Sequence, residues 1–534
     1  MKICIIGGGT AGWLAALWIV RSQPKLHEVT VIDSSKIDII GAGEGTTGQF
    51  RKVLRMFNIN EAEFMRECRA THKAAIRFEN WTGNRSSYIS PIDNTPTVLS
   101  DWDIMMIYHY LVNEGYNIHR ATIGGMLAEH ALSGYHKNCQ ESFSGYAFHF
   151  DGRLVGKYFK RLAAAECRTV DAVYKNANLD PITGRITSIE LDTGEKIHAD
   201  WFIDATGFAR VLAPVVDAGW HSYRDWLTCD HAIPFFLPHK ENSVIRPETG
   251  ATALDAGWMW KIPTRDRYGC GYVYDSTVKT YDQALEELEK KLGQPVEPVK
   301  HITYNPGRLA RPYCKNVMFI GLSGVFLEPL QATSIHGTIA QLHIFERLFL
   351  RPGKGPEGDF QNRRANQMVE SIFEEFADLI QLHYRSGRTD TEFWRKQQNL
   401  PARPQVEYLK EAANRRWLCD ADWNLGPGGA GYGVFIYPIL AYKWVNPDNL
   451  KRFAPGGADI DNTYRNWIKH IDSIKNSALT HNQMLEAIES GQIKQLRQSN
   501  PSGTVPDHDA NTVAMPRPKM QSQAPRGIHP LLRF

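Results

Sequence analysis

Residues 2–13 read KICIIGGGTAGW, and this stretch decides the fold of the first part of the chain. The apolar run 2–6 is short and ends in glycines, which predicts a buried parallel strand. A helix is expected over residues 10–21, and the β-branched run EVTVI at 28–32 predicts a second strand. Strand, glycine turn, helix and strand together predict one βαβ unit.

The glycines of this turn follow the pattern GxGxxG at Gly7, Gly9 and Gly12. In such a turn the first glycine permits the tight bend, the second lets the backbone approach a pyrophosphate, and the third lets the helix pack on the strand. Asp33 ends the second strand about 20 residues further on, where an acid that binds a ribose hydroxyl is expected. The pattern therefore predicts a dinucleotide site and not merely a tight turn.

A second glycine pattern, at Gly426, Gly428 and Gly431, has no strand before it and no βαβ pattern after it. We interpret it as a loop, so the chain has one dinucleotide site. The motif alone does not choose between FAD and NAD. The glycine-rich loop GEGTT at 43–47 and the turn DATGF at 204–208 resemble flavoproteins with two dinucleotide-binding domains, in which such a turn returns to the adenine end of FAD.

Beyond the first βαβ unit the sequence predicts a β-rich region, a helical region and a polar tail. Residues 153–205 predict a β-rich stretch with turns at 181–184 and 192–194. Residues 401–495 predict a mainly helical subdomain, and residues 496–534 form a polar, proline-rich tail. Further segments are expected as helices at 58–69 and 370–384, strands within 258–274 and at 317–321, and a helix from Thr333.

Composition excludes several classes of protein. The chain has 534 residues and a net charge of +3, without long runs of like charge, so no nucleic-acid partner is expected. Its 8 cysteines form no CxxC pair, so we expect no metal site and reduced thiols in a cytoplasmic protein. No apolar run reaches about 18 residues, so no membrane span is expected. The sequence leaves the oligomeric state open, a homo-oligomer included.

Several stretches carry a more specific resemblance. Trp13 follows the last glycine of the turn, and residues 258–263 read WMWKIP. The others are KAAIRFENW at 73–81, GYVY at 271–274, GLSGVFLEPL at 321–330, HY at 383–384 and FW at 393–394. Together, over roughly residues 1–396, they resemble the flavin-dependent tryptophan halogenase family, whose most specific signature is WxWxIP.

The resemblance implies an α/β fold with a Rossmann-type FAD-binding core like that of glutathione reductase. A β-sheet region lies on the substrate side and a mainly helical part follows. We expect residues 1–400 to form the FAD-binding and catalytic core, with a substrate-side insertion at about 85–150. The implied enzyme uses reduced FAD (FADH2), oxygen and a halide (chloride, bromide or iodide) to make hypohalous acid. Its substrate would be a small electron-rich aromatic of indole or phenol type. One dinucleotide site leaves no place for NAD(P)H, so a separate flavin reductase is expected.

The resemblance also assigns roles to residues. Lys73 matches the lysine that delivers halogen, although a lysine is more often a surface salt-bridge residue; its neighbours Ala74, Ala75 and Ile76 suggest a largely apolar strand. The backbone amides of Thr333 and Ser334 match the halide site. The expected cofactor contacts are Gly7, Gly9, Thr10, Ala11, Gly12, Asp33, Ala42, Glu44, Gly45, Leu322 and Ile335, and the expected substrate shield is Trp258, Trp260, Ile262 and Pro263.

The clearest departure from the family is Gln331. The family pattern reads EPLEST, whereas residues 328–333 read EPLQAT. The missing glutamate is the one that stabilises the cationic ring intermediate or takes its proton, and glutamine cannot act as a base. Glu328, water or another carboxylate is left for that role, and free tryptophan as substrate is in doubt. Two alternatives to a halogenase stay open: a flavin-dependent aromatic monooxygenase, and a flavin-binding protein without halogenase turnover.

Overall fold

The computed structural model describes residues 1–37, 41, 43–92, 122–137, 141–142, 145–350, 358–416, 418, 420–423, 429, 433–446, 448 and 457–498. The three glycines of the second pattern, Gly426, Gly428 and Gly431, lie outside these residues, as do Ala42 and the tail beyond residue 498. No helix within the described part of the chain is long and apolar enough to cross a membrane.

A six-stranded, largely parallel sheet carries the predicted βαβ unit. Its strand order is β10-β2-β1-β14-β23-β22, and β1 pairs in parallel with both β2 and β14. These strands are β1 (Lys2–Ile6), β2 (Glu28–Ile32), β10 (Arg168–Val170), β14 (Trp201–Asp204), β22 (Tyr313–Cys314) and β23 (Val317–Phe319). The predicted strands at 2–6, 28–32 and 317–321 are confirmed, with β23 two residues shorter.

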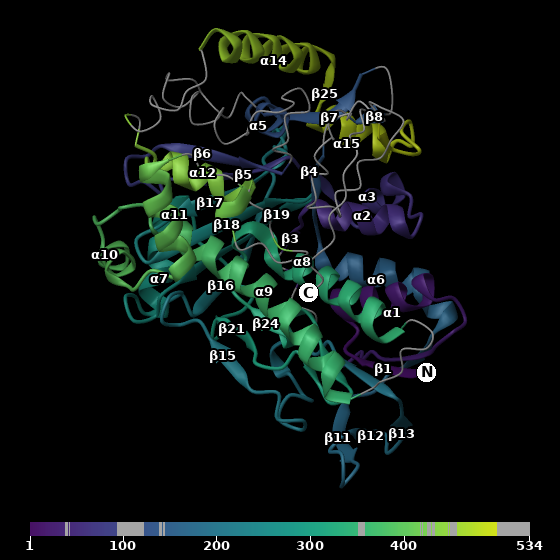
Figure 1. The fold of residues 1–534 in the computed structure, drawn as a ribbon. Coiled ribbons are helices and arrows are strands. Elements are labelled where there is room, and N and C mark those ends of the chain that lie inside the picture. Colours follow the sequence, from purple (N-terminus) through teal and green to yellow (C-terminus); the bar gives the residue numbers. More distant parts are fainter. Residues whose placement is uncertain are drawn as a thin grey trace, which may run out of the picture.

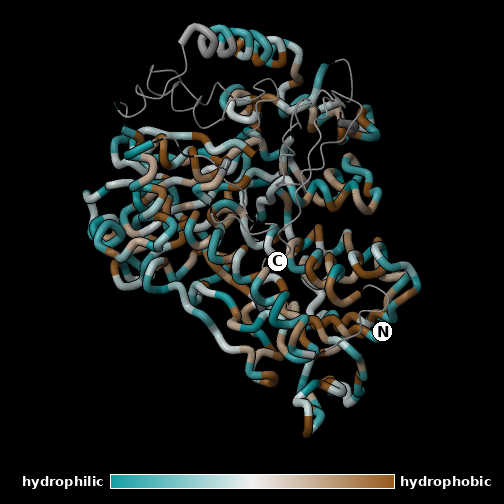
Figure 2. Tube along the Cα trace, in the orientation of Figure 1, coloured by the Kyte–Doolittle hydropathy of each residue, from teal (hydrophilic) through white to brown (hydrophobic). Residues whose placement is uncertain are grey.

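The helix that follows β1 is α1 (Thr10–Ser22), as predicted. It is buried along residues 12–20 and packs beside α6 (Gly152–Ala163), as Figure 1 shows near the amino terminus. In Figure 2 hydrophobic segments gather in the same region. The first glycine turn is therefore held between two helices and the parallel sheet.

The helix α6 corrects one prediction. The β-rich stretch was expected to start at Arg153, but residues 152–163 are helical. Asp151 caps the helix by accepting a hydrogen bond from the Arg153 backbone amide at 2.9 Å. Its buried residues Val155, Tyr158 and Phe159 recur at helical spacing, which outweighs strand-like local composition. Beyond it the β-rich prediction is confirmed by β11 (Tyr174–Leu179), β12 (Ile186–Leu191) and β13 (Lys196–His198).

A seven-stranded sheet forms the second layer, with strand order β20-β16-β19-β18-β17-β5-β6. It contains β18 (Gly257–Pro263) and β19 (Arg267–Tyr274), which confirms the strands predicted within 258–274. Its other strands are β5 (Ala75–Glu79), β6 (Ser87–Pro91), β16 (His231–Pro238), β17 (Glu248–Ala253) and β20 (Ile302–Thr303). A small sheet of order β3-β9-β4 lies beside it, made of β3 (Glu44–Gly45), β9 (Ala147–Phe150) and β4 (Thr71–Lys73).

Two helices, α8 (Thr333–Phe345) and α9 (Gly358–Tyr384), run side by side through the middle of the molecule (Figure 1). They confirm the helices predicted from Thr333 and over 370–384, and α3 (Glu61–Glu67) confirms a shorter form of the helix predicted over 58–69. The mainly helical character after residue 401 is also confirmed, by α11 (Pro404–Arg415), α12 (Gly433–Ala441), α14 (Gly457–Ser477) and α15 (His481–Glu489).

The remaining elements connect or cover these layers. The helices are α2 (Gly48–Met56), α5 (Ile123–Glu129), α7 (Tyr281–Leu292) and α10 (Glu392–Asn399). The strands are β7 (Leu132–His136), β8 (Glu141–Ser142), β15 (Trp220–Ser222), β21 (Gly307–Leu309), β24 (Val325–Phe326), β25 (Ala478–Thr480) and β26 (Arg497–Gln498). A single large core cluster joins residues of the parallel sheet, the second sheet and the helices between them.

Candidate active site

The glycine turn has the shape of a cofactor cradle. Gly7 has a φ of +113°, and a Cβ there would lie 2.4 Å from the Ala205 carbonyl oxygen. A Cβ on Gly12 would lie 1.9 Å from the Gly7 carbonyl oxygen, whereas one on Gly9 would meet no atom of the described residues within 4 Å. The chain's own packing thus requires Gly7 and Gly12, and Gly9 leaves its backbone open to a bound group.

The predicted ribose acid, Asp33, lies at this turn. Its carboxylate accepts hydrogen bonds from the Lys160 ammonium at 2.7 Å and from the Trp13 indole nitrogen at 3.1 Å. A Cβ on Gly8 would lie only 1.7 Å from the Asp33 carboxylate, so the acid packs directly against the turn. A ribose hydroxyl bound here would share Asp33 with Lys160, a residue that the sequence analysis did not find.

The other predicted cofactor contacts surround the start of α1. The Thr10 hydroxyl donates to the Gly152 carbonyl at 2.8 Å, and Ala11 faces Gly321, where an added Cβ would lie 2.9 Å from the Ala11 Cβ. Leu322 follows Gly321 in a short 3-10 turn, and Ile335 lies in the first turn of α8. Glu44 packs against Gly152, and its burial, with the charge of Asp151, raises its pKa to about 7.

Lys73 is buried at the end of β4. Its side chain is 1% exposed, and its ammonium donates to the Thr46 carbonyl at 3.0 Å. Its recorded polar contact is this carbonyl and it forms no ion pair with any described residue, so the interpretation as a surface salt-bridge lysine is wrong. Burial lowers the Lys73 pKa to about 7, which makes both the amine and the ammonium available near neutral pH.

His149 lies beside Lys73. A Cβ on Gly45 would lie 3.3 Å from the Lys73 nitrogen and 3.8 Å from the His149 ring. The Thr71 hydroxyl donates to the Pro263 carbonyl at 2.6 Å, so it accepts from His149 Nδ1 at 3.3 Å. His149 Nε2 then accepts from the Thr249 hydroxyl at 2.7 Å, and the ring is neutral with both nitrogens used. Burial, together with the charge of Lys73, holds the His149 pKa well below its usual value.

The opposite face of β4 carries His72, which ties the strand to the last part of the chain. The His72 backbone amide donates to His481 Nε2 at 3.2 Å, and His481 Nδ1 contacts the Ile245 carbonyl at 2.7 Å. The His72 ring stacks on Tyr146 at 4.0 Å, and Arg51 covers the same tyrosine ring at 3.6 Å. These buried contacts hold the strand of Lys73 in place, and no local sequence pattern predicts them.

The two tryptophans predicted to share one face of a strand do so. Their ring centroids lie 6.3 Å apart, and Trp260 fits over Gly271, where a Cβ would lie 2.1 Å from its ring. The Trp258 indole nitrogen donates to the Glu328 carboxylate at 2.9 Å, and the Tyr384 hydroxyl donates to the same oxygen. Burial raises the Glu328 pKa to about 7. All four residues predicted as the shield, Ile262 and Pro263 included, are buried. Trp258 contacts Glu328, and the Pro263 carbonyl contacts Thr71 on the strand of Lys73.

The turn that precedes α8 is strained. Gln331 has a φ of +64° and Ala332 a φ of +56°, a left-handed backbone conformation that residues other than glycine rarely adopt. Ala332 lies near Lys73, because both surround Gly45. A Cβ added to Gly45 would lie 3.6 Å from the Ala332 Cβ and 3.3 Å from the Lys73 nitrogen. No side chain caps α8, so the first backbone amides, including those of buried Thr333 and exposed Ser334, lack the usual capping acceptor.

The Gln331 side chain points toward His383 and not toward an acid or Lys73. Its amide nitrogen lies 3.0 Å from His383 Nε2. His383 is fully buried, stacked on Phe78 at 4.4 Å, and burial lowers its pKa to about 3. The ring therefore faces Gln331 in its neutral form.

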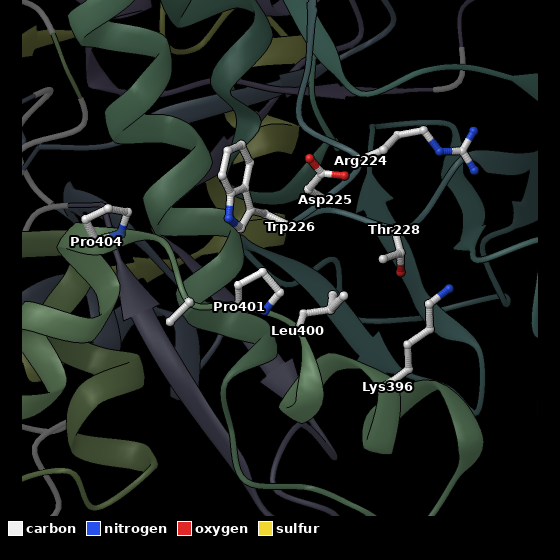
Figure 3. Close-up of a pocket in the computed structure, with 9 residues that line it drawn as sticks. Arg224, Asp225, Trp226, Thr228, Lys396, Leu400, Pro401 and Pro404 are labelled. Atoms are coloured by element: carbon white, nitrogen blue, oxygen red, sulfur yellow. The ribbon is translucent and has the colours of Figure 1, made fainter.

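A separate pocket of about 670 Å³ lies between the end of α10 and the loop before β16 (Figure 3). Its two cations are already paired, Lys396 with Asp275 at 2.6 Å and Arg224 with Asp230 at 2.6 Å. None of the predicted site residues lines it. Its walls are Arg224, Asp225, Trp226, Thr228, Lys396, Leu400, Pro401, Ala402 and Pro404.

Comparison with known proteins finds similarity to tryptophan halogenases and other flavin-dependent halogenases. The sequence profile of the tryptophan halogenases matches residues 2–425. Tryptophan 7-halogenase KtzQ of Kutzneria sp. (strain 744) is 31% identical over 440 residues, covering 75% of this chain and 79% of that protein. Tryptophan 7-halogenase RebH of Lentzea aerocolonigenes is 31% identical over 426 residues, with the same coverage. The structure of BrvH, a flavin-dependent halogenase from Brevundimonas sp. BAL3, superposes with a TM-score of 0.81 at 27% identity, covering 91% of this chain and 99% of that one.

Proposed function

Because the chain belongs to the tryptophan halogenase family and is a flavin-dependent halogenase, we propose that Lys73 delivers halogen from hypohalous acid to an electron-rich aromatic of indole or phenol type. The observation that carries this proposal is the burial of Lys73 without an ion pair among the described residues. As an amine Lys73 can take up the halogen, and as an ammonium it can polarise the acid. Either form makes the halogen electrophilic.

We assign FAD, in its reduced form, to the cradle of Gly7, Gly9 and Gly12, with Asp33 at the ribose. When bound, the reduced cofactor and oxygen supply the two-electron oxidation of chloride, bromide or iodide. The open backbone at Gly9 and the position of Asp33 beside Gly8 support this assignment. Around the same turn, Thr10, Ala11, Glu44, Gly45, Leu322 and Ile335 complete the proposed contacts; Ala42 belongs to the same proposal but lies outside the described residues.

For the halide we propose the backbone amides of Thr333 and Ser334. The first turn of α8 has orphan N–H groups and no capping side chain, and the amino end of a helix favours an anion. The nearby turn at Ala332 brings this site close to Lys73.

The resemblance to the family leaves Glu328 as a candidate catalytic residue. Its hydrogen bonds support a narrower role, in which the carboxylate orients Trp258 and Tyr384 behind the site. We propose that Trp258 and Trp260, with Ile262 and Pro263, keep the aromatic substrate away from the flavin so that direct oxygen transfer does not compete.

We also propose a cytoplasmic enzyme served by a separate flavin reductase. The described cysteines are free thiols, which suits a reducing compartment. The one glycine cradle within the described part of the chain is assigned to FAD, which leaves no second cradle there for NAD(P)H.

The test is to incubate the purified protein with FAD, oxygen, bromide and a panel of indoles and phenols, with and without a flavin reductase and NADH. Mass spectrometry should find the bromine isotope doublet in a product only when the reductase is present. Free hypohalous acid is scavenged throughout, so that halogenation in solution is not counted. Rapid NADH oxidation without the reductase would contradict the two-component assignment, and no halogenated product from any substrate would contradict the proposed function.

A further inference from the structure

A chain of hydrogen bonds behind Gln331 has a direction that can be derived from its far end. The Tyr442 hydroxyl donates to the His383 carbonyl at 2.8 Å, since a carbonyl can only accept. The Tyr88 hydroxyl, 3.0 Å from Tyr442, must then donate to it. With its proton used, Tyr88 accepts from His383 Nδ1 at 2.9 Å.

This direction determines what residue 331 can be. His383 carries its proton on Nδ1, so its Nε2 is a lone pair that requires a donor. The amide N–H of Gln331, 3.0 Å away, supplies one. Burial keeps His383 neutral, so the ring does not take a second proton. A glutamate in the same rotamer would place a carboxylate against this lone pair, whereas glutamine satisfies it.

With its amide nitrogen held by His383, the other end of the Gln331 side chain is also determined. Its carbonyl oxygen Oε1 has no hydrogen-bond partner among the described residues, and it is not one of the buried unpaired atoms there. It therefore opens on accessible space. The next residue in the chain, Ala332, faces Gly45 beside the Lys73 nitrogen, so Gln331 belongs to the same turn as the residue that faces the proposed delivery lysine.

We propose that Gln331 is a specificity-determining residue whose side-chain carbonyl, oriented by His383, accepts a hydrogen bond from an N–H or O–H group of the aromatic substrate. This inference rests on the proposed function and adds a requirement for a free N–H or O–H group on the substrate ring. The preferred substrates are neutral rings with a donor, such as indoles or phenols. An uncharged acceptor recognises the donor of the substrate without needing a cationic partner. Its dipole also stabilises the cationic ring intermediate that forms when the halogen adds to the substrate.

The experiment compares kcat/KM for indole and 1-methylindole in the wild type and in Gln331→Met, a variant of similar length that has neither amide group. A neutral hydrogen bond is worth about 1 kcal/mol, so the wild-type preference for indole should exceed that of the variant about fivefold. The change should be mostly in KM. The methyl group of 1-methylindole meets a side chain of similar size in both proteins, so steric effects are alike. The ratio of kcat/KM for indole to that for 1-methylindole therefore reports the hydrogen bond. Gln23→Met, at the end of α1, is the matched control and should keep the wild-type ratio.

Tyr442→Phe is a second, more distant test. It removes the donor that begins the chain, so His383 can change tautomer and Gln331 can turn its amide; the preference for indole should fall here too. This variant also decides the question if Gln331→Met does not fold. An unchanged substrate ratio in a folded, halogenating variant would overturn the inference and leave the proposed function standing. Absence of halogenation in the wild type with every substrate would instead overturn the proposed function.

Discussion

The indole nitrogen of Trp258 donates a 2.9 Å hydrogen bond to the buried carboxylate of Glu328. The two residues belong to different family stretches, WMWKIP on β18 and EPL before α8, and the hydrogen bond joins them. A second donor, Tyr384, binds the same oxygen from the end of α9. Glu328 is thus the point at which three elements of the site meet.

Glu328→Gln should keep halogenation within a few-fold of the wild type. The amide oxygen can accept from both Trp258 and Tyr384, so the shield is retained. Glu328→Ala leaves both donors unpaired in a buried site, which costs about 1–3 kcal/mol each, and should destabilise the protein and slow product formation. Steady-state rates and thermal melting of both variants check this. A loss of about a hundredfold or more in Glu328→Gln would instead assign proton transfer to Glu328.

Gly9→Ala and Gly12→Ala form a matched pair. A methyl group on Gly9 meets no atom of the described residues within 4 Å, so the variant should fold normally. It should bind FAD at least tenfold more weakly, since we propose that the Gly9 backbone faces the pyrophosphate. A methyl group on Gly12 lies 1.9 Å from the Gly7 carbonyl and should lower the melting temperature of the flavin-free protein. Flavin titration and melting curves separate the two effects. Equal FAD affinity in Gly9→Ala and the wild type would refute the assignment of the cradle.

Lys73→Ala should abolish halogenation but leave flavin content and peroxide release near wild-type levels. The Lys73 ammonium contacts the Thr46 carbonyl and is not among the nearest atoms around Gly7, Gly9 or Gly12, so we expect only delivery to be lost. Peroxide and halogenated indole are measured in parallel, with hypohalous acid scavenged. Lys36→Ala, at an exposed position paired with Asp192, serves as the control. Appreciable halogenation by the Lys73 variant would exclude the delivery role.

Lys73→Met should raise the melting temperature, most strongly at low pH. The Lys73 pKa is about 7 in the folded protein and near its ordinary value of 10.5 when unfolded. Between these values the unfolded chain binds the extra proton, so wild-type stability rises with pH from about 7 to 10.5. Below about pH 7 the buried charge is fully penalised. The increase in melting temperature caused by methionine should therefore be larger at pH 6 than at pH 9. An increase independent of pH would mean that burial does not lower the pKa of Lys73.

Gln331→Glu should not raise the rate of indole halogenation tenfold, although it restores the family residue. The new carboxylate would face the His383 lone pair and would be desolvated without a donor unless the pair, at either group, took up a proton. We expect lower stability and a new pH dependence from the pair. Rates, flavin content and melting curves across pH 6–9 check this. A tenfold gain with unchanged flavin content would show that the missing carboxylate alone limits catalysis.

Part of this structure was predictable because its signals are local. The run KICII, its glycine turn and the run EVTVI carry strand and helix periodicity in a few residues, and β1, α1 and β2 follow. The helix α6 was missed because its start depends on the Asp151 cap more than on composition. The domain boundaries at residues 400 and 495 stay predictions.

The site was predictable only where a family motif marks it. Lys73, Glu328 and Gln331 were found in this way, and their roles stay predictions. His383 lies in a matching motif, but its partners Tyr88 and Tyr442 come from β6 and the end of α12, far away in sequence. Residues His149 and His481 likewise acquire their neighbours only through the tertiary fold.

The hydrogen bond from the His72 amide to His481 has a consequence for the order in which the protein matures during synthesis. The strands of the parallel sheet end at residue 319, so the glycine turn and its sheet are complete when about three fifths of the 534-residue chain has been synthesised. The strand that ends in Lys73 gains its contact with His481 only after residue 481 has been made. If Lys73 delivers the halogen as proposed, a chain that stops before residue 481 would keep the glycine turn but lack this support for the delivering lysine.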